Sequence, residues 1–144
     1  WGENPNAGFC HTQVEPSREG KLLINIIDEL RVAAADGFLS LHEDVDAHQS
    51  YLYSFEQSPT PTEFSKGLAA TEQGFFPPLD DGDYDGAIFV NGIAHNYCDG
   101  SFEDRLFHEG SPRTVCTETP GARPFQELVD ATVAIIKTFL SYRT

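Results

Sequence analysis

The amino-acid sequence predicts an α/β fold, in which a mixed sheet carries helices packed on its faces. Segments with apolar residues at helical spacing alternate with short apolar runs of strand length, and turn residues separate them. Hydrophobic residues make up 40% of the 144 residues, enough to build a core. Such alternation is typical of layered α/β architectures. The sequence contains no repeat or linker, so we expect residues 1–144 to form a single α/β domain.

The helices are predicted from apolar stripes with a period near 3.6 residues. After a loop over residues 1–16, Leu22, Leu23, Ile26, Ile27 and Leu30 place a helix over residues 18–34, with Ser17 as its N-cap. A second helix is expected over residues 62–72, and one or two helical turns over 102–108. The apolar stripe that begins at Phe125 predicts a final helix over residues 125–140.

The strands are predicted from short apolar runs bounded by turn residues. These runs cover residues 38–41, 51–55, 87–90 and 114–117. Residues 74–86 hold two prolines, three glycines and four aspartates and are expected to form an acidic loop.

Charge and cysteine content exclude several classes of protein. The chain carries 9 basic and 23 acidic residues, a formal net charge of −14. A strongly acidic protein does not suit nucleic acid or an anionic membrane surface, because both attract basic patches. No stretch approaches the roughly 20 apolar residues of a membrane helix. Three cysteines without a CxxC pair favour reduced thiols and a cytoplasmic protein, with one disulfide plus a free thiol as the alternative.

Two charged residues follow predicted strands, and ligands of open α/β sheets bind beyond the carboxyl ends of strands. His42 follows the run over residues 38–41, and its imidazole suits a zinc ion. Glu118 follows the run over residues 114–117 and suits a general base. From the residues alone, an acidic loop with exposed histidines and a surface glutamate in a turn remain the alternatives. Asn6 offers amide donors to a carboxylate, or belongs to an ordinary Asn-Pro turn.

These segments occur in a recognisable order. Asn-Pro-Asn-x-Gly-Phe is followed by Glu-Pro-Ser-x-Glu, Phe-Leu-Ser-Leu-His-Glu-Asp and finally Thr-Glu-Thr-Pro-Gly before the last helix. The combination resembles the C-terminal part of the zinc carboxypeptidase superfamily, which includes the metallocarboxypeptidases and the succinylglutamate desuccinylase and aspartoacylase branch. The resemblance covers most of the chain and is most specific over residues 36–46 and 113–140.

The resemblance implies a role for individual residues. His42 matches the last of three zinc ligands and Glu118 the general base, while Asn6 and Tyr97 match substrate-binding positions. It implies zinc-dependent hydrolysis of a peptide or amide bond near a carboxylate, in a peptide or N-acyl amino acid substrate. Glu118 would take a proton from the attacking water and return it to the leaving amine.

The sequence departs from the family pattern at two points. The chain contains no His-x-x-Glu, which supplies the first two zinc ligands in the family, and Ala7 stands where an arginine is expected. Arg123, or alternatively Arg18, is then the candidate for binding a substrate carboxylate. We expect the chain to be the C-terminal part of a longer catalytic domain, with an N-terminal segment or a partner chain supplying the other ligands.

Two alternatives to that expectation stay open. One is a non-catalytic binding or assembly module that keeps the fold. The other is a different metal site, completed by His48, His95 or His108.

Overall fold

The computed structural model describes residues 5–9 and 15–142. Within them the chain forms five helices and six strands. The helices are α1 (Arg18–Asn25), α2 (Ile27–Ala33), α3 (Glu63–Gln73), α4 (Phe102–His108) and α5 (Phe125–Ser141). The strands are β1 (Phe38–Asp44), β2 (Tyr51–Glu56), β3 (Gly82–Tyr84), β4 (Ala87–Val90), β5 (Ile93–His95) and β6 (Arg113–Pro120).

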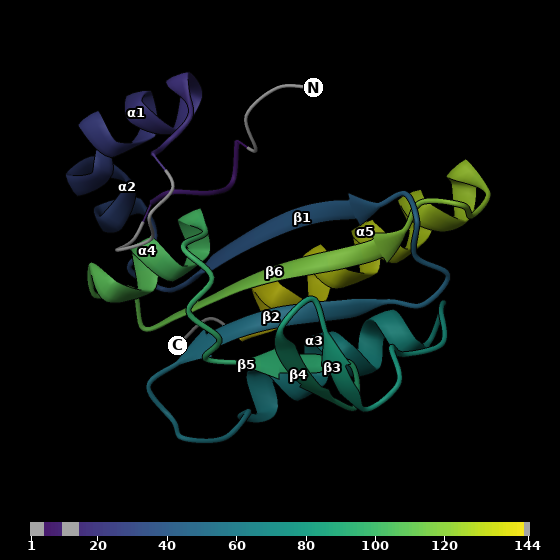
Figure 1. Ribbon diagram of the computed structural model, residues 1–144. Helices are drawn as coiled ribbons and strands as arrows, with labels where there is room; N and C mark the ends of the chain where they lie inside the picture. Colours follow the sequence, from purple (N-terminus) through teal and green to yellow (C-terminus); the bar gives the residue numbers. More distant parts are fainter. Residues whose placement is uncertain (1–4, 10–14, 143–144) are drawn as a thin grey trace.

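The strands of the described part form one mixed sheet in the order β1-β6-β2-β5-β4-β3 (Figure 1). β1 runs parallel to β6, β6 antiparallel to β2, and β2 parallel to β5. The remaining pairs, β5 with β4 and β4 with β3, are antiparallel. This arrangement confirms the predicted fold class, a mixed sheet with helices on its faces.

Helices α3 and α5 cover one face of the sheet, and α4 lies over the other face near one end of β1 and β6 (Figure 1). The first face buries an apolar cluster of Leu52, Phe64, Leu68, Ala69, Ile93, Val115 and Ile135. A separate cluster joins α1, α2 and α4 through Phe9, Ala34, Phe102 and Leu106. Residues of opposite parity along β1 and β6 therefore face different layers, as the two-residue period of strands requires.

The strand boundaries differ from the prediction in a way that affects the site. β1 continues to Asp44 and β6 to Pro120, so His42 and Glu118 lie within strands and not after them. The ladder between β1 and β6 extends through these charged residues, with Glu43 opposite Thr119 and Asp44 opposite Pro120. The predicted strands ended at residues 41 and 117 because His42 and Glu118, which line a polar cavity, interrupt the apolar pattern.

Other differences are local. The helix predicted over residues 18–34 is two helices, interrupted at Ile26, whose N–H bonds back to the carbonyls of Ile24 and Leu23. The predicted N-cap Ser17 is confirmed, since its hydroxyl accepts the Gly20 N–H at 2.9 Å. β3 lies in the predicted acidic loop, and β5 was too short to predict. In the described part, no helix is long and apolar enough to cross a membrane.

β1 is an edge strand of the sheet, and apolar side chains lie exposed beside it. Leu41 on β1 is 42% exposed, and Phe125 at the start of α5 is 79% exposed. With Leu128, Val129 and Val133 they line a hollow of about 360 Å³. We call these five residues the β1–α5 surface. An unpaired strand beside exposed apolar residues is a surface suited to covering by another polypeptide.

Candidate active site

Three adjacent strands place two of the predicted site residues, His42 and Glu118, on the face of the sheet that carries α4. On the parallel pair, His42 of β1 lies directly opposite Glu118 of β6. Across the antiparallel pair, Tyr53 of β2 lies opposite Cys116 of β6. Residues opposite one another share a face of the sheet, so their side chains meet. Backbone pairing thus sets the positions of His42 and Glu118.

The two side chains make direct contact. His42 Nδ1 lies 3.3 Å from Glu118 Oε1, and the side chains are 34% and 15% exposed. The hydrogen bond to the Glu118 carboxylate raises the pKa of His42 above its usual value. The carboxylate therefore favours the protonated form of the imidazole. Structure and sequence therefore agree in bringing together an imidazole and a carboxylate at one partly exposed position.

A cavity of about 380 Å³ opens beside this pair. It is lined by polar residues from β1, β2, β6 and the segments on either side of them: Pro5, Asn6, Ala7, His42, Tyr53, Asp99, Ser101, Glu103, Cys116 and Glu118. Tyr53 and Cys116 are both buried enough for desolvation to raise their pKa values. The nearby carboxylates raise these pKa values further, which keeps the phenol and the thiol neutral.

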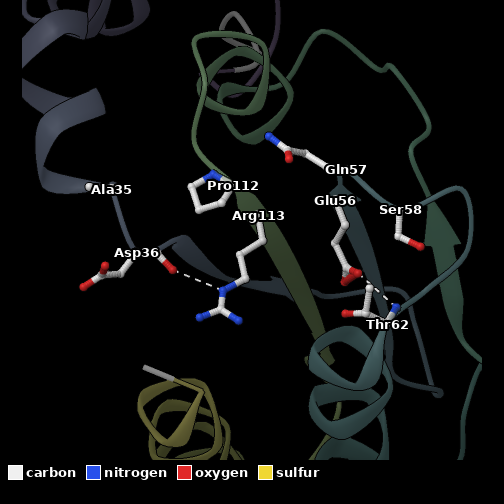
Figure 2. Close-up of a pocket in the computed structure, with 8 residues that line it drawn as sticks. All are labelled: Ala35, Asp36, Glu56, Gln57, Ser58, Thr62, Pro112 and Arg113. Atoms are coloured by element: carbon white, nitrogen blue, oxygen red, sulfur yellow. Dashed lines mark hydrogen bonds between the residues drawn. The ribbon is translucent and has the colours of Figure 1, made fainter. Parts of the chain in front are cut away.

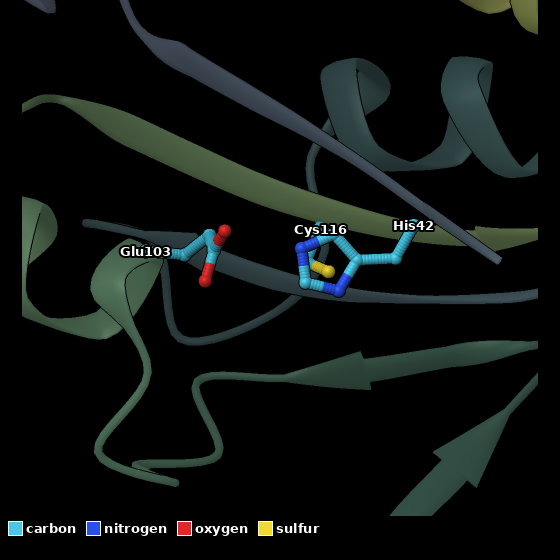
Figure 3. Close-up of side chains that lie close together, drawn as sticks. All are labelled: His42, Glu103 and Cys116. Carbon is cyan, nitrogen blue, oxygen red and sulfur yellow. The ribbon is translucent and has the colours of Figure 1, made fainter. Parts of the chain in front are cut away.

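Some of these side chains form a donor set suitable for a metal ion. Ligand atoms of His42, Glu103 and Cys116 lie within 4.8 Å of one another. Figure 3 shows the Glu103 carboxylate directed toward the His42 ring, with the Cys116 thiol beside the ring. Imidazole, carboxylate and thiolate are the ligands that zinc uses in proteins. The residues present therefore fit a zinc ion, and His42, which the sequence proposes as a zinc ligand, is one of them.

Asn6, proposed from the sequence to bind a substrate carboxylate, lines the cavity, and its amide is already engaged. Its Nδ2 donates to Glu103 Oε2 at 3.0 Å, and its Oδ1 accepts the Phe102 N–H at 3.0 Å. Both partners belong to the first turn of α4. Asn6 thus fixes the beginning of α4 and the orientation of the Glu103 carboxylate.

Two predicted substrate-binding residues lie elsewhere. Tyr97 packs among the aromatic residues around β4 and β5, and it is not among the residues lining the cavity. Arg123 is exposed between β6 and α5, where it donates to Glu127 at 2.8 Å. Its guanidinium also lies 5.6 Å from the centre of the Phe76 ring. The structure therefore groups His42, Glu118 and Asn6 but not Tyr97 or Arg123.

Sequence reasoning missed several residues of the cavity. Cys116 lies in the apolar run over residues 114–117 and is buried in the structure, but its thiol faces Glu118 at 3.8 Å. The alternation along β6 could have revealed this, because residues 116 and 118 share a face. Tyr53, Asp99, Ser101 and Glu103 follow no local motif and are brought in by the fold.

The other histidines do not join this cavity in the described part. His95 lies between the Ser54 hydroxyl and the Ser58 carbonyl, each 3.0 Å from a ring nitrogen. His48 is exposed. His108 lies 2.9 Å from an Asp104 carboxylate oxygen and, with Cys98, forms a separate group of potential ligands. Cys98 and Cys116 are free thiols, whereas Cys10 and His11 lie outside the described residues.

A second cavity, of about 320 Å³, opens at the opposite end of β6 and β2 (Figure 2). Its charged groups have structural partners: Arg113 Nε donates to the Asp36 carbonyl at 3.1 Å, and Glu56 Oε2 accepts the Thr62 N–H at 2.9 Å. Glu56 also accepts the Ser65 hydroxyl. These bonds join loops to α3, so we assign the second cavity a structural role.

Solved structures resemble this chain closely. A protein from Shewanella baltica, named a putative metallopeptidase, is 39% identical with a TM-score of 0.93, and the match covers 99% of this chain and 56% of that protein. A protein of the same name from Shewanella amazonensis is 36% identical, with the same TM-score and coverage. This chain thus spans just over half the length of both.

A more distant match is the metallo-carboxypeptidase from Burkholderia cenocepacia. It is 14% identical with a TM-score of 0.55, and the match covers 98% of this chain and 38% of that protein. No protein-family model matches the chain, and no curated protein sequence matches it significantly. At these levels of similarity, the comparisons and the sheet topology together establish that this chain has a metallopeptidase-like α/β fold.

Proposed function

We propose that this chain carries part of the active site of a zinc-dependent hydrolase of carboxypeptidase type, which cleaves a peptide or amide bond. The observation that carries the proposal is the contact between His42 and Glu118 across the parallel ladder of β1 and β6. The names of the similar Shewanella proteins support a metal-dependent hydrolase. The choice of zinc rests on the His42, Glu103 and Cys116 donor set and on the resemblance of the motifs.

The residues of this chain would act in the following way. His42 would hold the metal ion, because its ring is partly exposed and fixed by a strand. A bound zinc ion acts as a Lewis acid toward a carbonyl oxygen and makes water more acidic. Glu118 would accept a proton from the attacking water through its carboxylate and return it to the leaving amine. Because a strand holds Glu118, that carboxylate stays oriented throughout.

We further propose that the remaining metal ligands come from polypeptide that covers the β1–α5 surface. His42 lies on the edge strand, so residues beyond β1 are well placed to approach it. The exposed Leu41 and Phe125 would be buried by such polypeptide. Its source would be an N-terminal segment or a partner chain.

Zinc binding and hydrolysis test the function separately. We expect the enzyme complete with its covering polypeptide to hold zinc, measured by inductively coupled plasma mass spectrometry. The His42→Ala variant should lose the zinc, while Glu118→Gln keeps it and loses hydrolysis of a peptide library by at least about a hundredfold, a typical cost for removing a general base. His48→Ala, at an exposed histidine, is the matched control and should change neither. Full hydrolysis by Glu118→Gln would refute the mechanism.

One observation favours a second candidate, an assembly module that keeps the fold without catalysis. The β1–α5 surface would serve such a module equally well. In that case the complex with the covering polypeptide would form, hold no zinc and hydrolyse no peptide.

A further inference from the structure

A second group of potential metal ligands lies on α4 and on the segment before it. It consists of Cys98, Asp104 and His108, whose ligand atoms lie within 4.8 Å of one another. None of the three lines the cavity beside His42. Asp104 follows Glu103 directly, but neighbouring residues of a helix project about 100° apart, so the two carboxylates face different directions. The group is therefore separate from the donor set of the proposed active site.

Asp104 is the fixed member of the group. It is fully buried in the first turn of α4, where two hydrogen bonds hold it. Its N–H donates to the Ser101 hydroxyl at 3.2 Å, and its Oδ2 accepts the Gly100 N–H at 3.0 Å. The other oxygen, Oδ1, is buried without a well-aligned hydrogen bond among the described residues, and His108 Nδ1 lies 2.9 Å from it. The fold thus presents one carboxylate oxygen to the neighbouring side chains at a set position.

The other two members are exposed, so an ion can reach the group from solvent. His108 follows Asp104 by one helical turn, which places both side chains on the same side of α4. Cys98 approaches from the segment before the helix. Desolvation and the charges of Asp104 and Asp99 raise the pKa of the Cys98 thiol. A thiol that stays protonated is a weak nucleophile, so this exposed cysteine does not suit thiol catalysis.

The chemistry of the three ligands selects the kind of metal ion. Zinc is bound in proteins by thiolate, imidazole and carboxylate, which are the groups present here. Calcium and magnesium prefer oxygen ligands and do not suit a thiol. The guanidinium of Arg105, one residue further along α4, is engaged by Glu109 and the Phe9 carbonyl. A zinc ion would therefore bring the cation that the buried Asp104 carboxylate otherwise meets only in a protonated His108.

We propose that Cys98, Asp104 and His108 bind a zinc ion at a site separate from that of His42, with water completing the coordination. Zinc sites with three protein ligands keep such an open position. Binding releases the Cys98 thiol proton to solvent, because the thiolate is the ligand. The ion ties the segment before α4 to both ends of that helix, which carries Glu103 to the cavity. The site goes beyond the proposed function and does not depend on hydrolysis.

Cobalt titration of the 144-residue chain tests the site without an activity assay. Co²⁺ substitutes for zinc, and a thiolate bound to it gives a charge-transfer absorption in the near ultraviolet, which reports a cysteine ligand directly. The titration uses the His42→Ala variant under reducing conditions, so that the proposed active site lacks its histidine ligand. We expect about one Co²⁺ per chain to saturate the absorption, as for a mononuclear site. Added zinc should abolish it.

Variants in the same background identify the ligands. Cys98→Ser should abolish the absorption, and His108→Ala should weaken Co²⁺ binding at least about tenfold, since even the hydrogen-bond partners of metal ligands contribute that much. His48→Ala, at another exposed histidine, and Cys116→Ser, at the thiol of the other donor set, should change neither. No absorption in the His42→Ala variant would overturn the inference. Absorption that persists in Cys98→Ser, or that disappears in Cys116→Ser, would also overturn it.

A stability measurement gives a second readout. Zinc should raise the unfolding temperature of the His42→Ala variant but not that of the same variant carrying Cys98→Ser, because only a bound ion stabilises the folded state. If Cys98→Ser fails to fold, judged by near-ultraviolet circular dichroism, His108→Ala replaces it in both experiments. In the complete enzyme, hydrolysis without this second zinc would refute only the inference. Zinc at Cys98 without any hydrolysis would refute only the proposed function.

Discussion

Glu72 of α3 shows how a single buried carboxyl group makes the stability of the folded chain depend on pH. It is 1% exposed, and its Oε1 has no hydrogen-bond partner among the described residues. Burial raises its pKa well above the usual value, and the charge of Glu118 adds to the effect. The folded chain therefore keeps Glu72 protonated at pH values where the unfolded chain releases the proton.

The sign of the pH effect follows from this difference. Below pH 4.5 both states are protonated, and Glu72 adds no pH dependence. Above pH 4.5 the unfolded state binds fewer protons than the folded state. The free energy of unfolding therefore falls by up to about 1.4 kcal/mol per pH unit until the pH reaches the pKa of Glu72 in the folded chain. We expect Glu72→Gln, a neutral isostere, to be more stable than the original at pH 7 and to lose that advantage as the pH falls to 4.

Urea denaturation at several pH values measures this difference. Glu63→Gln, at an exposed position of the same helix, serves as the control and should show little pH-dependent change. A constant difference between Glu72→Gln and the original chain from pH 4 to 7 would contradict the assignment.

At the scale of elements, the packing of α3 on α5 depends on one glycine. A methyl group added at Gly67 would overlap the hydroxyl of Tyr142, which follows α5. That hydroxyl donates to the Glu63 carbonyl at 2.8 Å, and the Tyr142 ring packs edge-on against Phe64. Gly67 thus permits the close approach that ties the end of α5 to the start of α3.

We expect Gly67→Ala to destabilise the chain by about 1–3 kcal/mol, the usual cost of overpacking. This is opposite to the gain of about 1 kcal/mol that alanine usually brings inside a helix. Tyr142→Phe removes the overlapping oxygen, so Gly67→Ala should cost less in that background. Thermal unfolding of the two single variants and the double variant measures the coupling. Additive effects would show that Tyr142 does not limit the space at Gly67.

The sequence predicted most elements and part of the site. Apolar periodicity located α3, α5, β2 and β4 within a residue or two, because each buries one face. The strands predicted for β1 and β6 were too short, since His42 and Glu118 interrupt the apolar pattern while the backbone pairing continues. Glu103 and Asp99 could not be predicted, because only the docking of α4 beside β6 brings them to the cavity.

At the scale of the whole molecule, the exposed β1–α5 surface determines how the chain associates. Apolar side chains beside an unpaired edge strand favour contact with another polypeptide. We expect the isolated chain to self-associate at high concentration in sedimentation velocity. Leu41→Lys with Val133→Lys should reduce this association and also weaken binding of the covering polypeptide.

A matched change elsewhere gives the control. Ile88 on β4 is 62% exposed but lies far along the sheet from β1. Ile88→Lys should leave association unchanged. If both sets of substitutions reduce association equally, general hydrophobicity and not the β1–α5 surface would be responsible.

The pairing of His42 with Glu118 also determines where the chain tolerates insertions and deletions. One residue added or removed within β1 between Phe38 and His42 would turn the His42 side chain to the opposite face, toward α5. The turn between β1 and β2 contributes no residue to the cavity lining and can change length without moving either side chain. Length variants selected from a random library for retained zinc binding should therefore cluster in residues 45–49 and avoid β1 and β6.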